Sequence, residues 1–195
     1  MNWQESVPDK ILKQMIHSKI QPDYKRLSFM ELFAQMLLIV PKRSSCLFVE
    51  AGALIIDQEE NRILASGYNG PPAGGDNCFE VGCSRVVGGE IRKGEGRCRG
   101  LHGEVNAILH TVKYGIITKG MSMMSSRKPC YDCAKIIANS GLNKVYYLFD
   151  YNRKGEDERP EETLKKANIE LIKYESTYLK SLPDYKNNSR VFENY

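Results

Sequence analysis

Four side chains in two short segments have the types and spacing of a metal-assisted hydrolytic site. The first segment holds His102 and Glu104, and the second holds Cys130 and Cys133 directly after Pro129. An imidazole and two thiolates suit zinc, and three protein ligands leave a fourth coordination position open for water. Zinc in such a site lowers the pKa of water from about 15.7 to roughly 7, which supplies a nucleophile at neutral pH. The four residues therefore predict a catalytic zinc ion.

The spacing assigns a separate role to each of these residues. Cys130 and Cys133 are three residues apart at the start of a predicted helix, so one helical turn can carry both sulfurs to the same point. A helix N-terminus also favours the thiolate form of cysteine. Glu104 lies two residues after His102 and is predicted not to be a ligand. We expect it to act as general acid and base beside the metal.

The elements that must position these segments follow from apolar periodicity. Ser28 and Glu31 predict a capping box at the start of a helix whose apolar face runs to residue 40, and Pro41 is expected to end it. Further helices are predicted at 102–114, 131–140 and 161–167, and strands at 53–57, 62–66, 120–125, 145–149 and 169–174. This order predicts an α/β fold with a five-stranded mixed sheet flanked by helices in three α-β-α layers.

The chain is predicted to contain one folded domain. Residues 1–27 read as an N-terminal arm or short helix, 28–175 as the domain, and 176–195 as a polar tail. The first ten residues are polar and do not resemble a signal peptide, and no apolar run approaches the roughly 18 residues of a membrane span. We therefore expect a cytoplasmic protein without membrane contact. The net charge of +4 is too diffuse to predict duplex nucleic acid as a partner, but it suits a small anionic substrate.

Seven segments make the sequence similar to the deoxycytidylate (dCMP) deaminase family of the cytidine deaminase superfamily. They are residues 42–46, 51–55, 67–74, 102–108, 129–135, 141–151 and 167–170. The paired His-x-Glu and Pro-Cys-x-x-Cys motifs are those of zinc deaminases. The Gly-Tyr-Asn-Gly stretch that begins at Gly67 separates this family from tRNA adenosine deaminases and free-cytidine deaminases. The resemblance implies the cytidine deaminase-like fold and zinc-dependent hydrolysis of dCMP to dUMP, a precursor for dTTP synthesis.

The resemblance also implies further site residues and partners. A nucleotide contact is expected for Asn69, Arg43, Lys42, Ser44, Asn106 and Tyr151. Asn69 would bind the sugar or base, and Arg43, with its two neighbours, would meet the 5′-phosphate; the alternative for Arg43 is a solvated cation. The family forms hexamers and responds to dCTP and dTTP, so a homohexamer with these effectors is expected.

One position departs from the family pattern. The family usually has alanine between the metal-binding histidine and the catalytic glutamate, whereas this chain has Gly103. Because glycine leaves room where a methyl group would stand, a modified or slightly larger pyrimidine nucleotide is an alternative substrate.

The remaining four cysteines predict a second metal site. Cys46 and Cys78 match places where some relatives of the family carry ligands for a non-catalytic metal, while Cys83 and Cys98 fit less securely. Four thiolates around zinc would form a closed structural site and would order the long Gly-rich loop. The alternative is that they are buried small apolar side chains or free thiols.

Two functions of other classes remain open at this stage. A deaminase acting on tRNA or single-stranded DNA would need a basic stripe with aromatic stacking residues, and no such cluster stands out in the sequence. A non-enzymatic zinc module would have no need of Glu104 beside the ligand.

Overall fold

The structure is a computed structural model that describes residues 26–91, 98–151 and 158–181. At its centre lies a five-stranded sheet in the order β2-β1-β5-β6-β7. The strands are β1 (Gly52–Asp57), β2 (Arg62–Tyr68), β5 (Ser122–Arg127), β6 (Lys144–Phe149) and β7 (Glu170–Lys173). β1 is antiparallel to β2 and β5, whereas β5, β6 and β7 run parallel to one another. The mixed five-stranded sheet predicted from the sequence is therefore confirmed.

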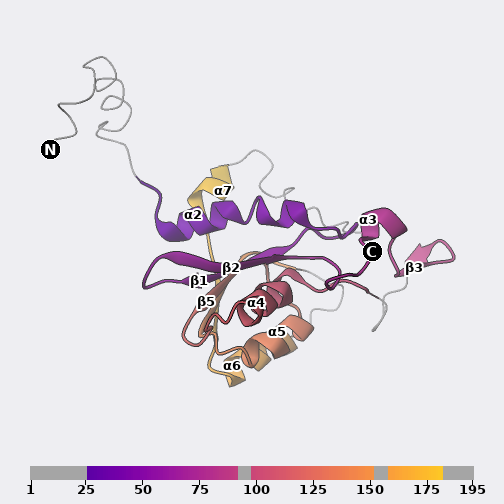
Figure 1. Cartoon of the computed structure of the whole chain (residues 1–195). Helices are drawn as coiled ribbons and strands as arrows, with labels where there is room; N and C mark the ends of the chain where they lie inside the picture. Colours follow the sequence, from indigo (N-terminus) through magenta and orange to yellow (C-terminus); the bar gives the residue numbers. More distant parts are fainter. Residues whose placement is uncertain (1–25, 92–97, 152–157, 182–195) are drawn as a thin grey trace, which may run out of the picture.

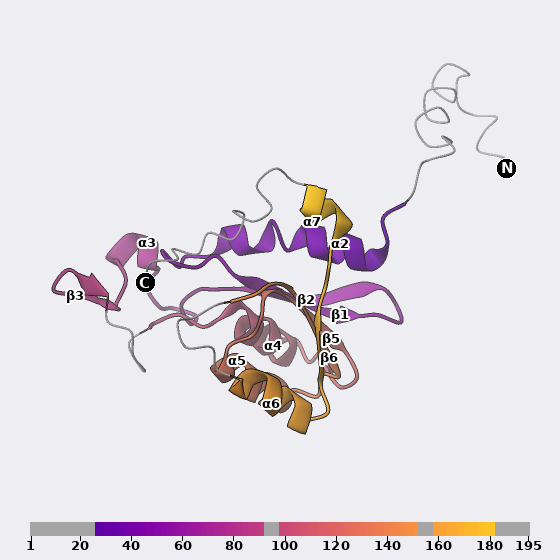
Figure 2. The same cartoon turned by 180° about the vertical axis from the view of Figure 1, so that it is seen from behind.

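Helices cover both faces of this sheet (Figures 1 and 2). α4 (Gly103–Lys113), α5 (Tyr131–Ala138) and α6 (Arg159–Lys166) lie on one face, and α2 (Phe29–Met36) and α7 (Thr177–Ser181) lie on the other. The strands alternate their buried residues between two cores, so that Ile55 and Met123 face α4 and α5 while Leu54 and Met124 face α2. The three α-β-α layers are thus those expected. Within the described ranges, no helix is long and apolar enough to span a membrane.

Two stretches differ from the sequence-based expectation. α2 ends at Met36, and a 3₁₀ helix, η2 (Val40–Arg43), follows it. Pro41 lies in the first turn of η2, a position where a missing N–H costs nothing. The Gly-rich loop contains the short helix α3 (Cys78–Val81) and a small hairpin of β3 (Val86–Val87) and β4 (Glu90–Ile91).

The predicted capping box forms only in part. The hydroxyl of Ser28 accepts a 3.1 Å hydrogen bond from the Glu31 amide, as expected. The buried Glu31 carboxylate instead accepts hydrogen bonds from the Ser176 hydroxyl and the Tyr178 amide, which tie α7 to α2. Leu179 of α7 is fully buried in the α2-side core, although it follows the predicted domain end at 175. The predicted arm at 1–27 lies almost wholly outside the described residues, as does most of the predicted tail.

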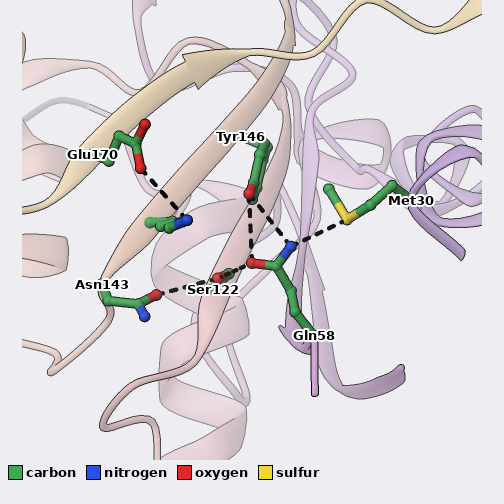
Figure 3. Close-up of polar contacts among 7 residues, drawn as sticks. Met30, Gln58, Ser122, Asn143, Tyr146 and Glu170 are labelled. Carbon is green, nitrogen blue, oxygen red and sulfur yellow. Dashed lines mark hydrogen bonds and ion pairs between the residues drawn. The ribbon is translucent and has the colours of Figure 1, made fainter. Parts of the chain in front are cut away.

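A polar network joins the strands at the end of the sheet where β5 and β6 begin (Figure 3). Gln58, in the turn between β1 and β2, accepts a 2.7 Å hydrogen bond from Ser122 and donates one of 3.3 Å to the Tyr146 hydroxyl. Ser122 also donates to Asn143 at 3.2 Å. These contacts close one end of the sheet. The opposite end, where the parallel strands finish, is the usual place for a ligand site in α/β folds.

Candidate active site

Three glycines let α4 approach the sheet unusually closely. A Cβ atom on Gly67 of β2 would lie 2.2 Å from the Ala107 nitrogen and 2.3 Å from the Gly103 oxygen. A Cβ atom on Gly103 would lie 2.7 Å from the Cα of Gly52 in β1. Asn69 fixes the same helix start, because its Oδ1 accepts a 2.8 Å hydrogen bond from the Gly103 amide. The first turn of α4 is thereby held against β1 and β2.

His102 and the two cysteines meet at the starts of two helices. His102 is the N-cap residue of α4, and Cys130 is the N-cap residue of α5. His102 Nδ1 lies 3.3 Å from the Cys130 sulfur and 3.3 Å from the Cys133 sulfur, and the two sulfurs are 3.6 Å apart. Within the described part of the chain, no other group of three or more His, Cys, Asp or Glu residues has its ligand atoms within 4.8 Å of one another.

The protonation of the two thiols fits metal binding. Hydrogen bonds from Cys133 and then from His102 outweigh the effect of burial and lower the pKa of Cys130 to about 4. The pKa of Cys133 is raised by its hydrogen bond to Cys130 and by burial. Cys130 is therefore a thiolate at neutral pH, and a bound cation would favour the thiolate of Cys133 as well. This donor set of one imidazole and two thiols suits zinc with one position left open.

Glu104 lies beside this group but has a different environment. Its carboxyl is 5% exposed, its Oε2 lies 3.7 Å from the Cys133 sulfur, and its Oε1 accepts a 3.3 Å hydrogen bond from Ser125 of β5. Burial raises the pKa of Glu104, and the nearby His102 opposes part of this rise. A carboxyl group with a raised pKa takes up a proton more readily than an exposed one, which suits a residue that must accept a proton and then donate it.

These groups open into one pocket, called here the site pocket. Its walls include His102, Glu104, Cys130, Asn69 and Tyr151. Both polar atoms of the Asn69 side chain already have backbone partners, since its Nδ2 donates to the Val49 carbonyl at 3.1 Å. The contacts of Asn69 and Tyr151 with a nucleotide therefore stay predictions.

The other residues expected to bind the nucleotide lie elsewhere. Arg43 and Asn106 line a second cavity of about 590 Å³ that adjoins the site pocket at Gly70. Lys42 is exposed and pairs with Glu50 at 2.6 Å. Ser44 is buried and donates a 3.0 Å hydrogen bond to the Asn69 carbonyl, which supports the loop. Neither Lys42 nor Ser44 lines either cavity, so the structure does not bring this group together around one site.

Gly103 has a structural explanation that the sequence did not reveal. The methyl group that alanine would add points at the backbone of β1, where Gly52 Cα would lie at 2.7 Å. Gly103 is not part of the wall of the site pocket. The interpretation that Gly103 leaves room beside the substrate is therefore wrong. Gly103 no longer gives a reason to expect a modified pyrimidine as substrate.

The four remaining cysteines gather loosely around one end of the site pocket. Cys46, Cys78 and Cys98 line that pocket. Burial raises the pKa of the Cys78 thiol, and the neighbouring Cys83 and Cys46 raise it further. No three of the four sulfurs, all of which are described, lie within 4.8 Å of one another. The second zinc site stays a prediction.

Three polar residues at the end of β5 were missed from the sequence. Ser125 contacts Glu104, and Arg127 and Lys128 line the site pocket. β5 is buried along its whole length, yet it ends in Ser125, Ser126 and Arg127, just before the Pro-Cys pair. Polar residues at the carboxyl end of a central strand, next to a metal ligand, were the signal that could have identified them.

Comparison with known proteins agrees with this geometry. Residues 27–149 match the family model described as the cytidine and deoxycytidylate deaminase zinc-binding region. The deoxycytidylate deaminase of Enterobacteria phage T4 is 30% identical over 71% of this chain and 86% of its own length. ComE operon protein 2 of Bacillus subtilis (strain 168) is 34% identical over 65% of this chain, and the match spans 62% of that protein.

A solved structure supports the same assignment. The dCMP deaminase of cyanophage S-TIM5, in complex with dCMP and dUMP, has 26% sequence identity and a TM-score of 0.61, covering 77% of this chain and 100% of that one. The chain therefore belongs to the deoxycytidylate deaminase family, within the cytidine deaminase superfamily, and is a deaminase of the hydrolase class.

Proposed function

We propose that the chain hydrolyses dCMP to dUMP and ammonia with the help of one zinc ion. The observation that carries the proposal is the meeting of His102, Cys130 and Cys133 within 4.8 Å, with Glu104 3.7 Å from the Cys133 sulfur. These three residues would hold the ion, which would supply the Lewis acid that makes water acidic near neutral pH. The dCMP complex of the cyanophage relative supports the choice of substrate.

The protein groups would divide the proton transfers between them. Glu104 accepts a proton from the water that attacks C4 of the cytosine ring and passes it to ring N3. It then takes the proton of the new C4 hydroxyl and delivers it to the departing amino group. The C4–N bond breaks as the C4 carbonyl forms, so that water and dCMP become dUMP and ammonia. Ser125 holds the carboxyl in place through its hydrogen bond to Oε1. The two glycine contacts of α4 keep Glu104 and His102 at their positions.

The other finer assignments belong to this proposal as well. We propose that Cys46, Cys78, Cys83 and Cys98 bind a second, structural zinc ion, which the proximity of Cys78 to the other three thiols supports. All six cysteines are described and free, in keeping with a reducing cytoplasm. A homohexamer that responds to dCTP and dTTP is proposed on the family resemblance, and the exposed apolar residues Val112, Tyr114 and Ile117 offer surface for such contacts. Light scattering of the full chain, with and without these nucleotides, tests the assembly.

A substrate panel tests the main proposal. The zinc-loaded chain is incubated with dCMP, deoxycytidine, dCTP, a 5-substituted dCMP and a cytosine-containing oligonucleotide, and the loss of cytosine absorbance is followed. We expect the highest kcat/KM for dCMP. Activity on the oligonucleotide alone would favour a polynucleotide deaminase, and no activity with any compound would favour a zinc module without catalysis.

A further inference from the structure

Arg127 is the one site-pocket residue with a buried charge that its protein surroundings leave partly unsatisfied. It ends β5 and is 5% exposed. Its Nε and Nη1 atoms are buried, and neither has a hydrogen-bond partner among the residues that the structure describes. An ionised group removed from water without partners is costly, and arginine cannot escape the cost by losing its proton. Such a group in a pocket indicates that an anionic ligand binds there and supplies the missing partners.

The charges around Arg127 do not neutralise it. Among the described residues, the carboxylate near it is that of Glu50, which pairs with Lys42 at 2.6 Å. Lys128, the next residue, lines the same pocket as a second cation and pairs with Glu161. Burial lowers the pKa of Arg127, although the guanidinium stays charged. Arg127 therefore carries a positive charge with two free donors in the pocket that also contains Glu104 and Cys130.

The position of Arg127 relative to the ligands is suitable for substrate binding. It lies three residues before Cys130 and pairs in register with Phe149 of β6, two residues before Tyr151. Tyr151 also lines the pocket and interacts electrostatically with Arg127. These residues mark the carboxyl ends of the two central parallel strands, where ligands of α/β proteins bind.

We infer that Arg127 is the residue that binds the 5′-phosphate of the nucleotide substrate. The inference rests on the proposed dCMP deamination and deepens it, because a phosphate is the anionic group of that substrate. Two adjacent N–H donors of a guanidinium match two phosphate oxygens. Arg43, the residue assigned to the phosphate from the sequence, is exposed to solvent and lines the second cavity instead of the site pocket.

The test separates recognition of the phosphate from recognition of the base. Binding of dUMP and of deoxyuridine to the zinc-loaded full chain is measured by calorimetry for the wild type, Arg127→Leu, Arg127→Lys and Arg43→Gln. Arg62→Leu, an exposed arginine of β2, is the matched control. We expect Arg127→Leu to weaken dUMP binding roughly 10- to 100-fold and to leave deoxyuridine binding unchanged. Arg127→Lys should lose less dUMP affinity than Arg127→Leu, because lysine keeps the positive charge. Some loss should remain, because lysine lacks the paired donors of the guanidinium.

Two results would overturn the inference. One is an equal loss of dUMP and deoxyuridine binding in Arg127→Leu, which would place the guanidinium against the base or give it a structural role. The other is a loss of phosphate preference in Arg43→Gln while Arg127→Leu keeps it. If Arg127→Leu does not fold, the comparison of the two ligands in Arg127→Lys decides. If the wild type deaminates dCMP but the variants give one of these two results, only the role of Arg127 is disproved. If the wild type does not turn over dCMP, the proposed function itself is disproved.

Discussion

The hydroxyl of Ser125 donates a 3.3 Å hydrogen bond to Oε1 of Glu104, and both side chains are buried. This contact orients the carboxyl beside Cys133. We expect Ser125→Ala to lower kcat/KM about tenfold, the effect of one lost hydrogen bond of roughly 1.4 kcal/mol. Glu104→Gln keeps the shape but cannot transfer protons, so its loss should reach roughly 100- to 10,000-fold. Steady-state kinetics on dCMP measures both effects.

Zinc content separates the catalytic role of these two residues from a structural one. Both variants should retain the zinc of the wild type, because neither residue is among the three proposed ligands. Ser66→Ala in β2, which lies outside both cavities, is the matched control for Ser125→Ala. Wild-type turnover in Glu104→Gln would contradict the assignment of the general acid–base.

Gly103→Ala tests the close approach of α4 to β1. The added Cβ would lie 2.7 Å from Gly52 Cα and 3.2 Å from the Ala51 oxygen. Both are backbone atoms, which cannot avoid the clash by a side-chain rotation. We expect the free energy of unfolding to fall by about 1–3 kcal/mol, the usual cost of overpacking. Urea denaturation of the zinc-loaded protein measures it. Gly100→Ala, where the nearest atom would lie at an ordinary 3.5 Å, is the control and should cost far less. Equal stability of the two variants would show that the helix start moves freely.

The gathering of His102, Cys130 and Cys133 beside Glu104 could be predicted from the sequence, because residue type and spacing indicate it. Their roles as metal ligands and general acid–base stay predictions. His102 and the Cys-x-x-Cys pair lie next to the starts of predicted helices, and local periodicity is enough to find these helices. The five strands followed from the same kind of local pattern. Contacts made by side chains distant in sequence could not be found this way. Arg43 and Asn106 match family motifs, yet the fold directs them to the second cavity.

The reason for Gly103 also depends on tertiary structure. Its neighbour Gly52 lies 51 positions earlier, and only the packing of α4 on β1 brings the two together. Likewise the partner of Glu31 was predicted to be the local Ser28 amide, but the carboxylate bonds to Ser176 and Tyr178 instead. A buried carboxylate takes whichever donors the fold brings to it, and sequence spacing alone does not state which these are.

Loss of one imidazole should remove the catalytic zinc. His102→Ala leaves two thiols, and metal affinity with two protein ligands is far weaker than with three. We expect one equivalent of zinc fewer per chain than in the wild type, and no deamination. His110→Ala on the same helix is the control, because His110 is exposed and contacts the Ser66 carbonyl at 2.8 Å. Elemental analysis gives both numbers, and a wild type with a single zinc ion would disprove the proposed second site.

Glu31 is predicted to hold α7 on α2 without taking part in the site. Its carboxylate accepts hydrogen bonds from the Ser176 hydroxyl, the Tyr178 amide and the Tyr174 hydroxyl, the last at 3.2 Å. Glu31→Ala leaves these donors without their partner and should lower the free energy of unfolding by about 2 kcal/mol. Glu31→Gln should cost less, because an amide oxygen still accepts.

Hydrogen exchange locates the effect of the Glu31 substitution. Faster exchange is expected at Tyr178 and Leu179, while dCMP turnover stays close to that of the wild type because α2 lies on the sheet face opposite α4 and α5 (Figure 2). Glu59→Ala, in the exposed turn between β1 and β2, is the matched control. Unchanged protection at Leu179 would mean that burial of this leucine, and not the carboxylate, holds α7 in place.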